Sequence, residues 1–269
     1  MIELKVLHIW NTAGVGSIIA KYMDKIYGTE SWVIMRKSFD RFGFTTYGEY
    51  CNHNAYFFAL KALLKAAKYD IIHVHAFDRI VPFLKSIYNK PLILHYHGTD
   101  IRGKWNERRK YWKKADIVLY STRDLKNGET PKHAIWLPNP VDTELFYEKH
   151  PVKYPRTALT MSYKANDIAK QIALNYKLKL VIHDRKNNLI PYRELADILC
   201  DYEYYIDAKR TYYKGKHILI KDYSKTALEA LACNRKVIRW DGRIVENLPE
   251  QHKPHQFVKK LYKIYSFLL

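Results

Sequence analysis

The sequence predicts an α/β protein made of two doubly wound domains, of which the second is short. Short apolar runs alternate with helical segments along residues 4–142, a pattern typical of a parallel sheet with helices on both faces. Segment 146–156, with Pro151 and Pro155 among charged residues, predicts the linker. The same alternation then resumes. We therefore expect domains at 1–148 and 149–254, and a C-terminal helix at 255–269 that packs back on the first domain.

The first domain is expected to open with strand 4–10, a turn containing Gly14 and Gly16, and an apolar helix that begins at Ser17. Asn54 is a good N-cap for the helical pattern over 54–68. The remaining elements are expected in this order: strands 31–37 and 70–77, helix 82–88, strand 91–100, basic helix 105–114, strand 115–121 and a last apolar segment at 134–142.

The second domain repeats the rhythm after the linker. A short apolar run, Ile218 to Ile220, leads through a polar turn into a helix that Ser224 would cap. The other expected elements are strand 157–163, helix 166–177, strand 178–184, helix 191–202, strand 203–209, strand 236–240 and the final amphipathic helix.

Composition limits the class of protein. The chain has 269 residues and is 48% hydrophobic, enough for a sizeable core. Its 3 cysteines have no metal-ligand spacing, which fits a reducing compartment. The N-terminus runs directly into a strand-like pattern, so we expect no signal peptide, and no apolar stretch reaches the roughly 18–20 residues of a membrane span. A cytoplasmic location is expected.

The net charge of +19 predicts an anionic partner: nucleic acid, an acidic lipid surface or a phosphorylated substrate. A lysine-rich thermophilic surface would also be basic, but Glu normally rises with Lys in such proteins and here it does not. Basic residues are spread over both predicted domains and no nucleic-acid motif is present, so the pattern does not favour nucleic acid.

Two helix starts are candidate phosphate sites. The loop Gly14-Val15-Gly16 follows a strand and precedes a helix, so its backbone can approach a phosphate closely. Ser224-Lys225-Thr226 opens a second helix with unpaired N–H groups and an added cation, and Glu229 follows at a depth suited to a ribose. Each stretch taken alone also fits an ordinary tight turn or a capped helix.

Histidines gather where predicted strands end. His97 meets a glycine turn after strand 91–100, where it can donate to an anionic oxygen or exchange a proton. Asp100 follows and could orient His97 or bind a hydroxyl. His73 and His75 share one face of their strand. A metal site is conceivable, but no carboxylate or cysteine completes a ligand set, so none is expected.

The basic segment 104–114 is interleaved with Trp105, Tyr111 and Trp112. Charge runs are usually solvated faces. This one is also compatible with a helix that rests on an acidic membrane surface.

Several segments together resemble family-four glycosyltransferases with the GT-B fold. In the first half these are HVH at 73–75, HGTD at 97–100, ADIVLYST at 115–122 and NPVDTELF at 139–146. In the second half they are IPYRELADIL at 190–199, YYID at 204–207 and SKTALEALACN at 224–234, the last closest to archaeal and bacterial members. The resemblance implies two Rossmann-like domains facing a cleft, a nucleotide-sugar donor, retention of configuration, and no obligatory metal or cofactor.

The resemblance also implies roles for individual residues. Glu229 would hold the donor ribose, and the N–H groups around Ser224, Lys225 and Thr226 would hold the diphosphate. Gly14, Val15 and Gly16 would approach the phosphates from the first domain, and His97 would lie at the transferred sugar. Ile190 and Tyr192 would line the base pocket. Lys164 is the best candidate for a phosphate-binding cation of the family. Lys221 stands where many members carry Glu, and it could supply phosphate charge instead.

These observations predict a metal-independent hexosyltransferase that uses a UDP- or GDP-sugar. The basic surface favours a saccharide or lipid-linked acceptor presented at a membrane, with peripheral binding to its inner face. Two alternatives stay open. A non-catalytic GT-B-like binding protein would explain Lys221, and a basic nucleic-acid-binding protein would explain the charge. The sequence does not identify the sugar, the base, the acceptor, the oligomeric state or the source organism.

Overall fold

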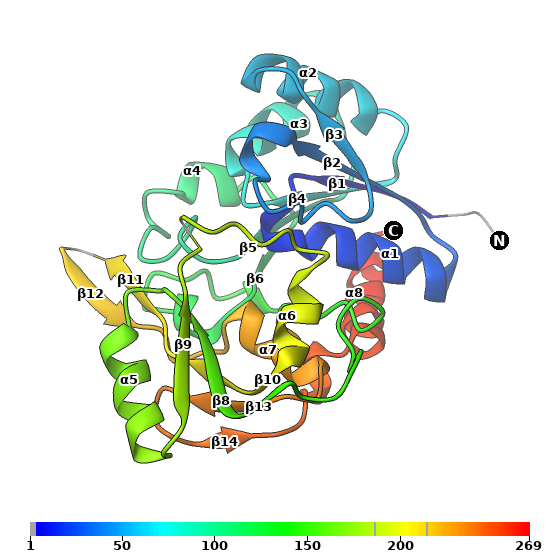
Figure 1. The fold of residues 1–269 in the computed structure, drawn as a ribbon. Coiled ribbons are helices and arrows are strands. Elements are labelled where there is room, and N and C mark those ends of the chain that lie inside the picture. Colours follow the sequence, from blue (N-terminus) through cyan, green and yellow to red (C-terminus); the bar gives the residue numbers. More distant parts are fainter. Residues whose placement is uncertain (1–3, 186, 214) are drawn as a thin grey trace. The chain divides into compact units, whose positions relative to one another are not determined.

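The computed structural model describes residues 4–185, 187–213 and 215–269. The chain divides into two compact units (Figure 1). Unit 1 comprises Met1–Pro140 and Pro254–Leu269, and unit 2 comprises Val141–Lys253. The division thus falls at Pro140, whereas the linker prediction places it after residue 148.

Unit 1 is a doubly wound parallel sheet. Its seven strands lie in the order β3-β2-β1-β4-β5-β6-β7, and every recorded pair is parallel. The strands are β1 Lys5–Ile9, β2 Glu30–Arg36, β3 Glu49–Cys51, β4 Ile71–His75, β5 Leu92–Tyr96, β6 Ile117–Tyr120 and β7 Ile135–Trp136. The α-helices are α1 Val15–Tyr27, α2 Ala55–Ala66, α3 Val81–Ile87, α4 Arg109–Trp112 and α8 Pro254–Leu268.

Alternating side chains build a core on each face of this sheet. Leu7 and Val74 belong to a core that includes Phe58 of α2 and Leu84 of α3. Val6, Ile71 and Ile93 point the other way, into a core shared with α1 and α8. The C-terminal helix α8 therefore belongs to unit 1, in the place expected for segment 255–269. Tyr27 of α1 stacks on Tyr262 of α8 with ring centroids 4.0 Å apart.

Unit 2 has a smaller sheet of five strands in the order β14-β13-β10-β8-β9. Strands β13, β10, β8 and β9 run parallel, and β14 pairs antiparallel at the edge. The strands are β8 Tyr154–Met161, β9 Lys179–His183, β10 Tyr202–Asp207, β13 Lys236–Arg239 and β14 Ile244–Val245; the helices are α5 Asn166–Asn175, α6 Leu195–Asp201 and α7 Lys225–Ala232.

Three details differ from the sequence-based expectations. The run 218–220 is not a strand of the main sheet, because β12 (Lys216–Leu219) pairs antiparallel with β11 (Arg210–Tyr213) as a separate hairpin. The expected basic helix 105–114 shortens to α4, with turns before it. Strand β3, three residues at the sheet edge, was not anticipated.

Candidate functional site

The N-terminus of α7 is built as the sequence predicts. Ser224 is the N-cap residue, and its side-chain oxygen accepts a hydrogen bond from Ala227 N at 3.2 Å. Thr226 is buried in the first turn. The first N–H groups of an α-helix have no acceptor inside the helix, so such a terminus favours an anion.

A buried carboxylate lies one turn further along α7. Glu229 is 1% exposed, and its Oε1 accepts a 2.8 Å hydrogen bond from the hydroxyl of Tyr192, which is equally buried. Lys225 Nζ lies 3.6 Å from the same oxygen and 4.8 Å from the centre of the Tyr192 ring. Burial raises the pKa of Glu229, and the Lys225 ammonium opposes that rise. Tyr192, Lys225 and Glu229 therefore form one hydrogen-bonded ion pair that fixes the carboxylate.

Asp207 and Arg239 also reach the start of α7, and sequence reasoning did not single them out. Asp207 ends β10, and its Oδ2 accepts from Ser224 N at 3.2 Å. Arg239 Nε lies 3.6 Å from that oxygen. Burial raises the pKa of Asp207, while the hydrogen bonds from Ser224 and the charge of Arg239 oppose the rise. The strand-end position of Asp207 is the signal that could have identified it, since ligands of open α/β sheets bind at carboxyl ends of strands.

The other predicted donor residues of unit 2 lie apart from this ion pair. Lys221 is exposed, with Nζ 5.5 Å from the centre of the Trp240 ring, and its carbonyl oxygen accepts from Arg239 Nη2. Lys164 is exposed in the loop between β8 and α5, with φ of 58°. Ile190 is half-buried just before Tyr192. No recorded side-chain contact among the described residues joins these three to Glu229.

The glycine loop of unit 1 forms the uncapped start of α1. Gly14 is the N-cap residue with φ of 79°, a conformation that favours glycine, and no side chain caps the helix there. Val15 is buried. A Cβ on Gly16 would lie 3.1 Å from Asn11 Oδ1 and 3.4 Å from His75 Nε2. The missing side chain at Gly16 thus lets the helix start approach His75 closely.

Buried histidines line the α1-facing side of the sheet toward its carboxyl edge. His8, His73, His75 and His95 are 0% exposed, and we call these four the histidine stripe. In the sheet register His8 pairs with His73, and His75 pairs with His95. The stripe continues the alternation that places Val6, Ile71 and Ile93 on this face.

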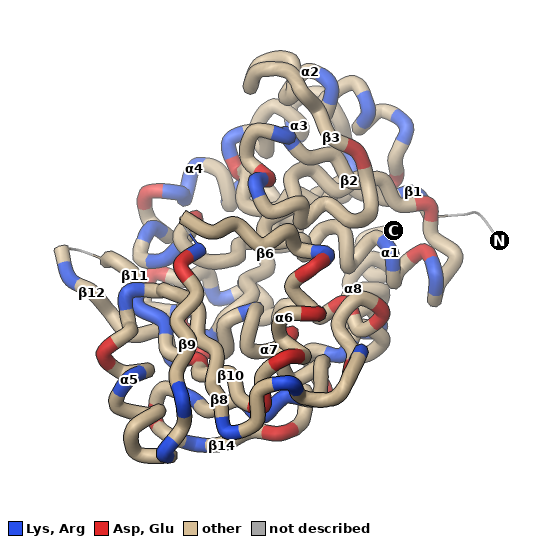
Figure 2. Tube along the Cα trace, in the orientation of Figure 1, with Lys and Arg blue, Asp and Glu red and all other residues tan. Residues whose placement is uncertain are grey.

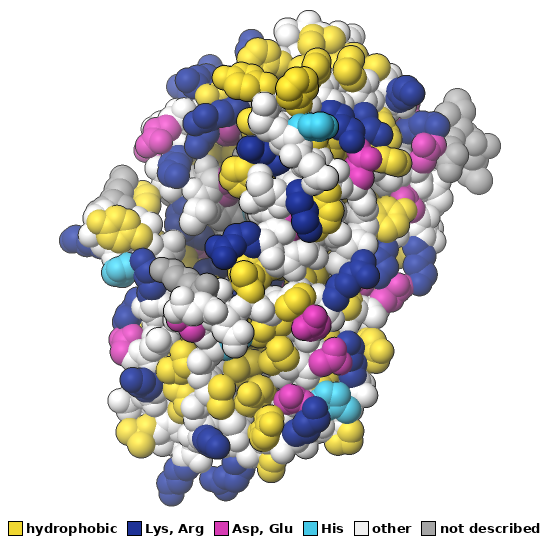
Figure 3. Space-filling model, turned by 45° about the horizontal axis from the view of Figure 1, so that its top comes forward, with side chains coloured by type: hydrophobic (Ala, Val, Ile, Leu, Met, Phe, Trp, Pro, Cys, Tyr) yellow, Lys and Arg dark blue, Asp and Glu magenta, His cyan; other side chains and the backbone are white. Residues whose placement is uncertain are grey.

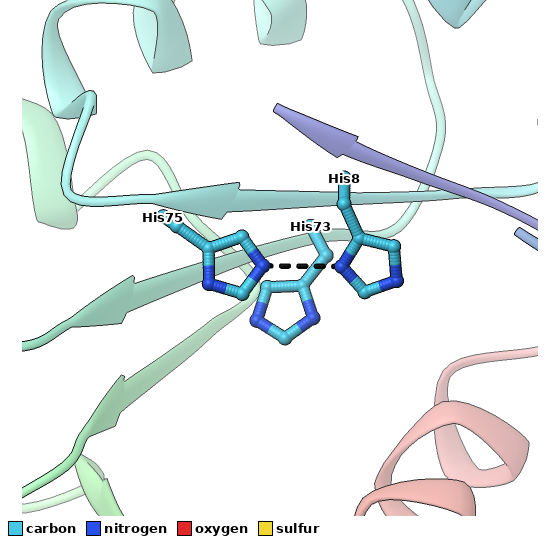
Figure 4. Close-up of side chains that lie close together, drawn as sticks. All are labelled: His8, His73 and His75. Atoms are coloured by element: carbon cyan, nitrogen blue, oxygen red, sulfur yellow. Dashed lines mark hydrogen bonds between the residues drawn. The ribbon is translucent and has the colours of Figure 1, made fainter. Parts of the chain in front are cut away.

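Hydrogen bonds link the stripe to His97. His8 Nδ1 lies 3.1 Å from His75 Nε2 (Figure 4), and His75 Nδ1 lies 3.1 Å from His97 Nε2. His97 Nδ1 lies 2.7 Å from Ser121 Oγ, which donates to Tyr96 O at 3.1 Å. With Ser121 donating to that carbonyl, each imidazole needs one proton to complete every link of the chain. The network therefore holds neutral rings.

The protonation states agree with this network. Burial lowers the pKa of His8 to about 3 and lowers the pKa of His73, His75 and His95 well below the usual value. Two triads, His8 with His73 and His75, and His75 with His95 and His97, have ring nitrogens within 4.8 Å of one another. These are the described residues best placed to hold a metal, yet both triads lack a carboxylate or thiolate ligand.

Asp100 acts on the backbone in this structure. Its Oδ2 accepts from His97 N at 2.9 Å, and its Oδ1 accepts from Gly98 N at 2.5 Å. Asp100 thus positions the turn after β5, whereas Ser121 and His75 contact the His97 ring. Ser121 was missed from the sequence; its place two residues after Leu119 of β6, on the histidine face, could have identified it.

The basic segment 104–114 does not present its tryptophans to solvent. Trp105 is 0% and Trp112 is 8% exposed, and their Nε1 atoms donate to Leu125 O and Trp105 O. Lys and Arg are distributed along both units rather than on one element (Figure 2). Across the part of the chain that the structure describes, no helix combines the length and apolar character that a bilayer crossing requires.

Comparisons with known proteins agree with this architecture. Residues 29–145 match the family model Glycosyltransferase Family 4. No curated protein sequence matches the chain. Among solved structures, a sucrose-phosphate synthase from Thermosynechococcus elongatus is similar with a TM-score of 0.55 and 13% identity, over 88% of this chain and 81% of that one. A UDP-GlcNAc 2-epimerase from Neisseria meningitidis, bound to UDP-GlcNAc, is similar with a TM-score of 0.51 and 12% identity, over 98% of this chain and 92% of that one.

At these identities the structural likeness shows the fold alone. The α/β prediction with two Rossmann-like units of the GT-B type is confirmed. The family match confirms the resemblance to family-four-like glycosyltransferases. Together, the match and the fold support sugar transfer in general, and with it an enzyme.

Proposed function

We propose that the chain is a retaining glycosyltransferase that moves a sugar, of the hexosyl type, from a nucleotide-diphosphate sugar to an acceptor. The observation that carries the proposal is the buried Glu229 carboxylate. It lies one turn into α7 and is fixed by Tyr192 at 2.8 Å and Lys225 at 3.6 Å. Burying a carboxylate costs free energy, so a position that keeps one fits a ligand that the carboxylate contacts.

In this proposal Glu229 accepts hydrogen bonds from the donor ribose, and the N–H groups of residues 224–226 hold the diphosphate. Helix N–H groups and fixed cations stabilise the charge that develops on the leaving diphosphate without having to reorganise. Arg239, beside Asp207, and the exposed Lys164 and Lys221 add positive charge to this unit. The acceptor attacks on the leaving-group face, so no enzymic nucleophile and no obligatory metal is assigned.

The residues of unit 1 keep the roles that the family resemblance implies. The Gly14-Val15-Gly16 loop approaches phosphate, since α1 begins there without a side-chain cap. His97 contacts the transferred sugar, and Asp100 supports it through the backbone. A UDP- or GDP-sugar is the proposed donor. UDP-GlcNAc bound to the Neisseria epimerase, a protein of similar fold, supports the UDP form.

Donor hydrolysis and transfer test the enzyme proposal. Glu229→Ala and His97→Ala should each abolish turnover of the active nucleotide sugar while circular dichroism stays unchanged. Glu246→Gln is the matched control, because its side chain is 62% exposed. Unchanged turnover in both site variants would overturn the assignment.

A non-catalytic binding protein is the second candidate, and Lys221 is the observation that favours it. In many members of the family this position is a carboxylate, and here an exposed lysine lies over Trp240. Tight binding of a nucleotide sugar with no hydrolysis or transfer would identify this second function.

A further inference from the structure

The outer face of α2 exposes an unusual set of large apolar side chains. Tyr56 is 87%, Phe57 58%, Leu60 50% and Leu64 65% exposed. At 100° per residue these four lie within an arc of about 100°, on one side of the helix. The opposite side carries Phe58, Ala62 and Ala66, which are buried in the core of unit 1.

Neighbouring α3 extends this surface. Phe83 is 62% and Ile87 is 58% exposed. The two segments are joined where Tyr88 OH donates to Leu63 O at 2.9 Å, just after α3. Figure 3 shows hydrophobic side chains gathered at the top of the molecule, the end that α2 occupies in Figure 1. Contiguous exposed apolar area of this kind marks an interaction surface in a folded protein.

Positive charge surrounds the apolar residues. Residues 50–69 contain Lys61, Lys65 and Lys68 and no Asp or Glu, and residues 79–99 contain Arg79, Lys85 and Lys90 and no Asp or Glu. A groove of about 440 Å³ is lined by Phe57, Leu60 and Leu64 together with the three lysines of α2 and its C-terminal end. Glu49, 3.0 Å from Lys61 Nζ, neutralises part of this charge.

From this arrangement we infer that the α2–α3 surface docks on an anionic lipid membrane. Aromatic and leucine side chains on one helix face, bordered by lysines, suit the interface between acyl chains and acidic headgroups. A second copy of this chain fits less well, because two basic surfaces of a +19 protein would repel each other. The surface differs from segment 104–114, whose Trp105 and Trp112 are buried. The inference does not depend on the proposed sugar transfer.

Co-sedimentation with lipid vesicles tests the inference directly. The full chain is mixed at low salt with phosphatidylcholine vesicles with and without about one third phosphatidylglycerol. The double variant Leu60→Glu/Leu64→Glu removes two exposed apolar side chains and adds negative charge. Leu174→Glu is the matched control, because Leu174 is 72% exposed on a helix of unit 2.

The expected result is binding to anionic vesicles that weakens as salt rises, since surface charges are screened. The α2 double variant should bind at least about tenfold more weakly, because apolar burial and charge attraction are both lost. Leu174→Glu should bind like the wild type. Circular dichroism verifies that both variants are folded.

Three outcomes would overturn the inference. One is no binding of the wild type to anionic vesicles. Another is equal binding by the α2 double variant, with loss instead after Lys110→Glu/Lys113→Glu. The third is a concentration-dependent dimer that the α2 variant dissociates while vesicles are ignored, which would assign the surface to a second copy of the chain.

Discussion

Acidification should destabilise unit 1 steeply, because the histidine stripe is buried in its neutral form. Burial lowers the pKa of His8 to about 3, and lowers the pKa of the other members well below 6.5. In the unfolded chain a histidine titrates near its usual value, about 6.5. Below that pH the unfolded state binds protons that the folded state does not. The stability is therefore fully present above about pH 6.5 and is lost as pH falls toward the folded-state values.

The size of the effect follows from the number of protons. One histidine that titrates only when unfolded costs about 1 kcal/mol of unfolding free energy between pH 6.5 and 5.5, so the stripe costs about 4 kcal/mol. Domains are stable by about 5–15 kcal/mol, so this loss is a large part of the total. Asp78 acts in the opposite direction, because burial raises its pKa, but a carboxyl group contributes at lower pH.

Urea unfolding at pH 7.5, 6.5 and 5.5 measures the loss. The Trp240→Phe background confines tryptophan fluorescence to unit 1, because the other tryptophans all lie there. His8→Gln should reduce the pH-dependent loss by about 1 kcal/mol. The exposed His53, changed to Gln, should leave it unaltered. A loss below about 1 kcal/mol between pH 6.5 and 5.5 would refute the reasoning.

Three further predictions concern individual contacts. Tyr192→Phe removes a buried hydrogen bond to a carboxylate and should lower the unfolding free energy by about 2 kcal/mol in urea denaturation, whereas Tyr212→Phe, at a 64% exposed position, should change it little; equal midpoints would contradict the ion pair. Gly14→Ala places a side chain at φ of 79° and should cost about 1 kcal/mol by the same assay; Gly128→Ala, where a Cβ meets nothing within 4 Å, is its control, and equal effects would argue against a required glycine. Because hydrogen bonds already join the histidine rings, overnight treatment with a strong chelator should leave the thermal midpoint and the turnover unchanged, and a fall in either that zinc restores would show a resident metal.

Local pattern predicted most of the fold. Apolar runs bounded by turn residues identified the parallel strands, and Asn54 marked the start of α2, where its side chain accepts from Tyr56 N and Phe57 N. The segment 104–114 was harder, because its charge density reads as a solvated helix. Burial of Trp105 and Trp112 is a tertiary property, set by partners such as Leu125 O that no local pattern reveals.

The candidate site shows a similar limit. The sequence identified Ser224 as a cap and placed Glu229 one turn further along, but it treated Tyr192 as part of a base pocket. The hydrogen bond that joins Tyr192 to Glu229 links positions 37 residues apart, so it depends on how α7 packs in unit 2. In the same way, the link between Asp207 and Ser224 N requires β10 to end beside α7.

Binding of a nucleotide sugar at Glu229 is the central claim, and titration calorimetry tests it most directly. UDP-, GDP- and ADP-sugars would be titrated into the wild type, Glu229→Gln and the exposed control Glu246→Gln. The prediction is that at least one nucleotide sugar binds the wild type and the control equally, and binds Glu229→Gln at least about tenfold more weakly, a loss of about 1.4 kcal/mol. Equal affinity for Glu229→Gln, or no binding of any nucleotide sugar to the wild type, would contradict it.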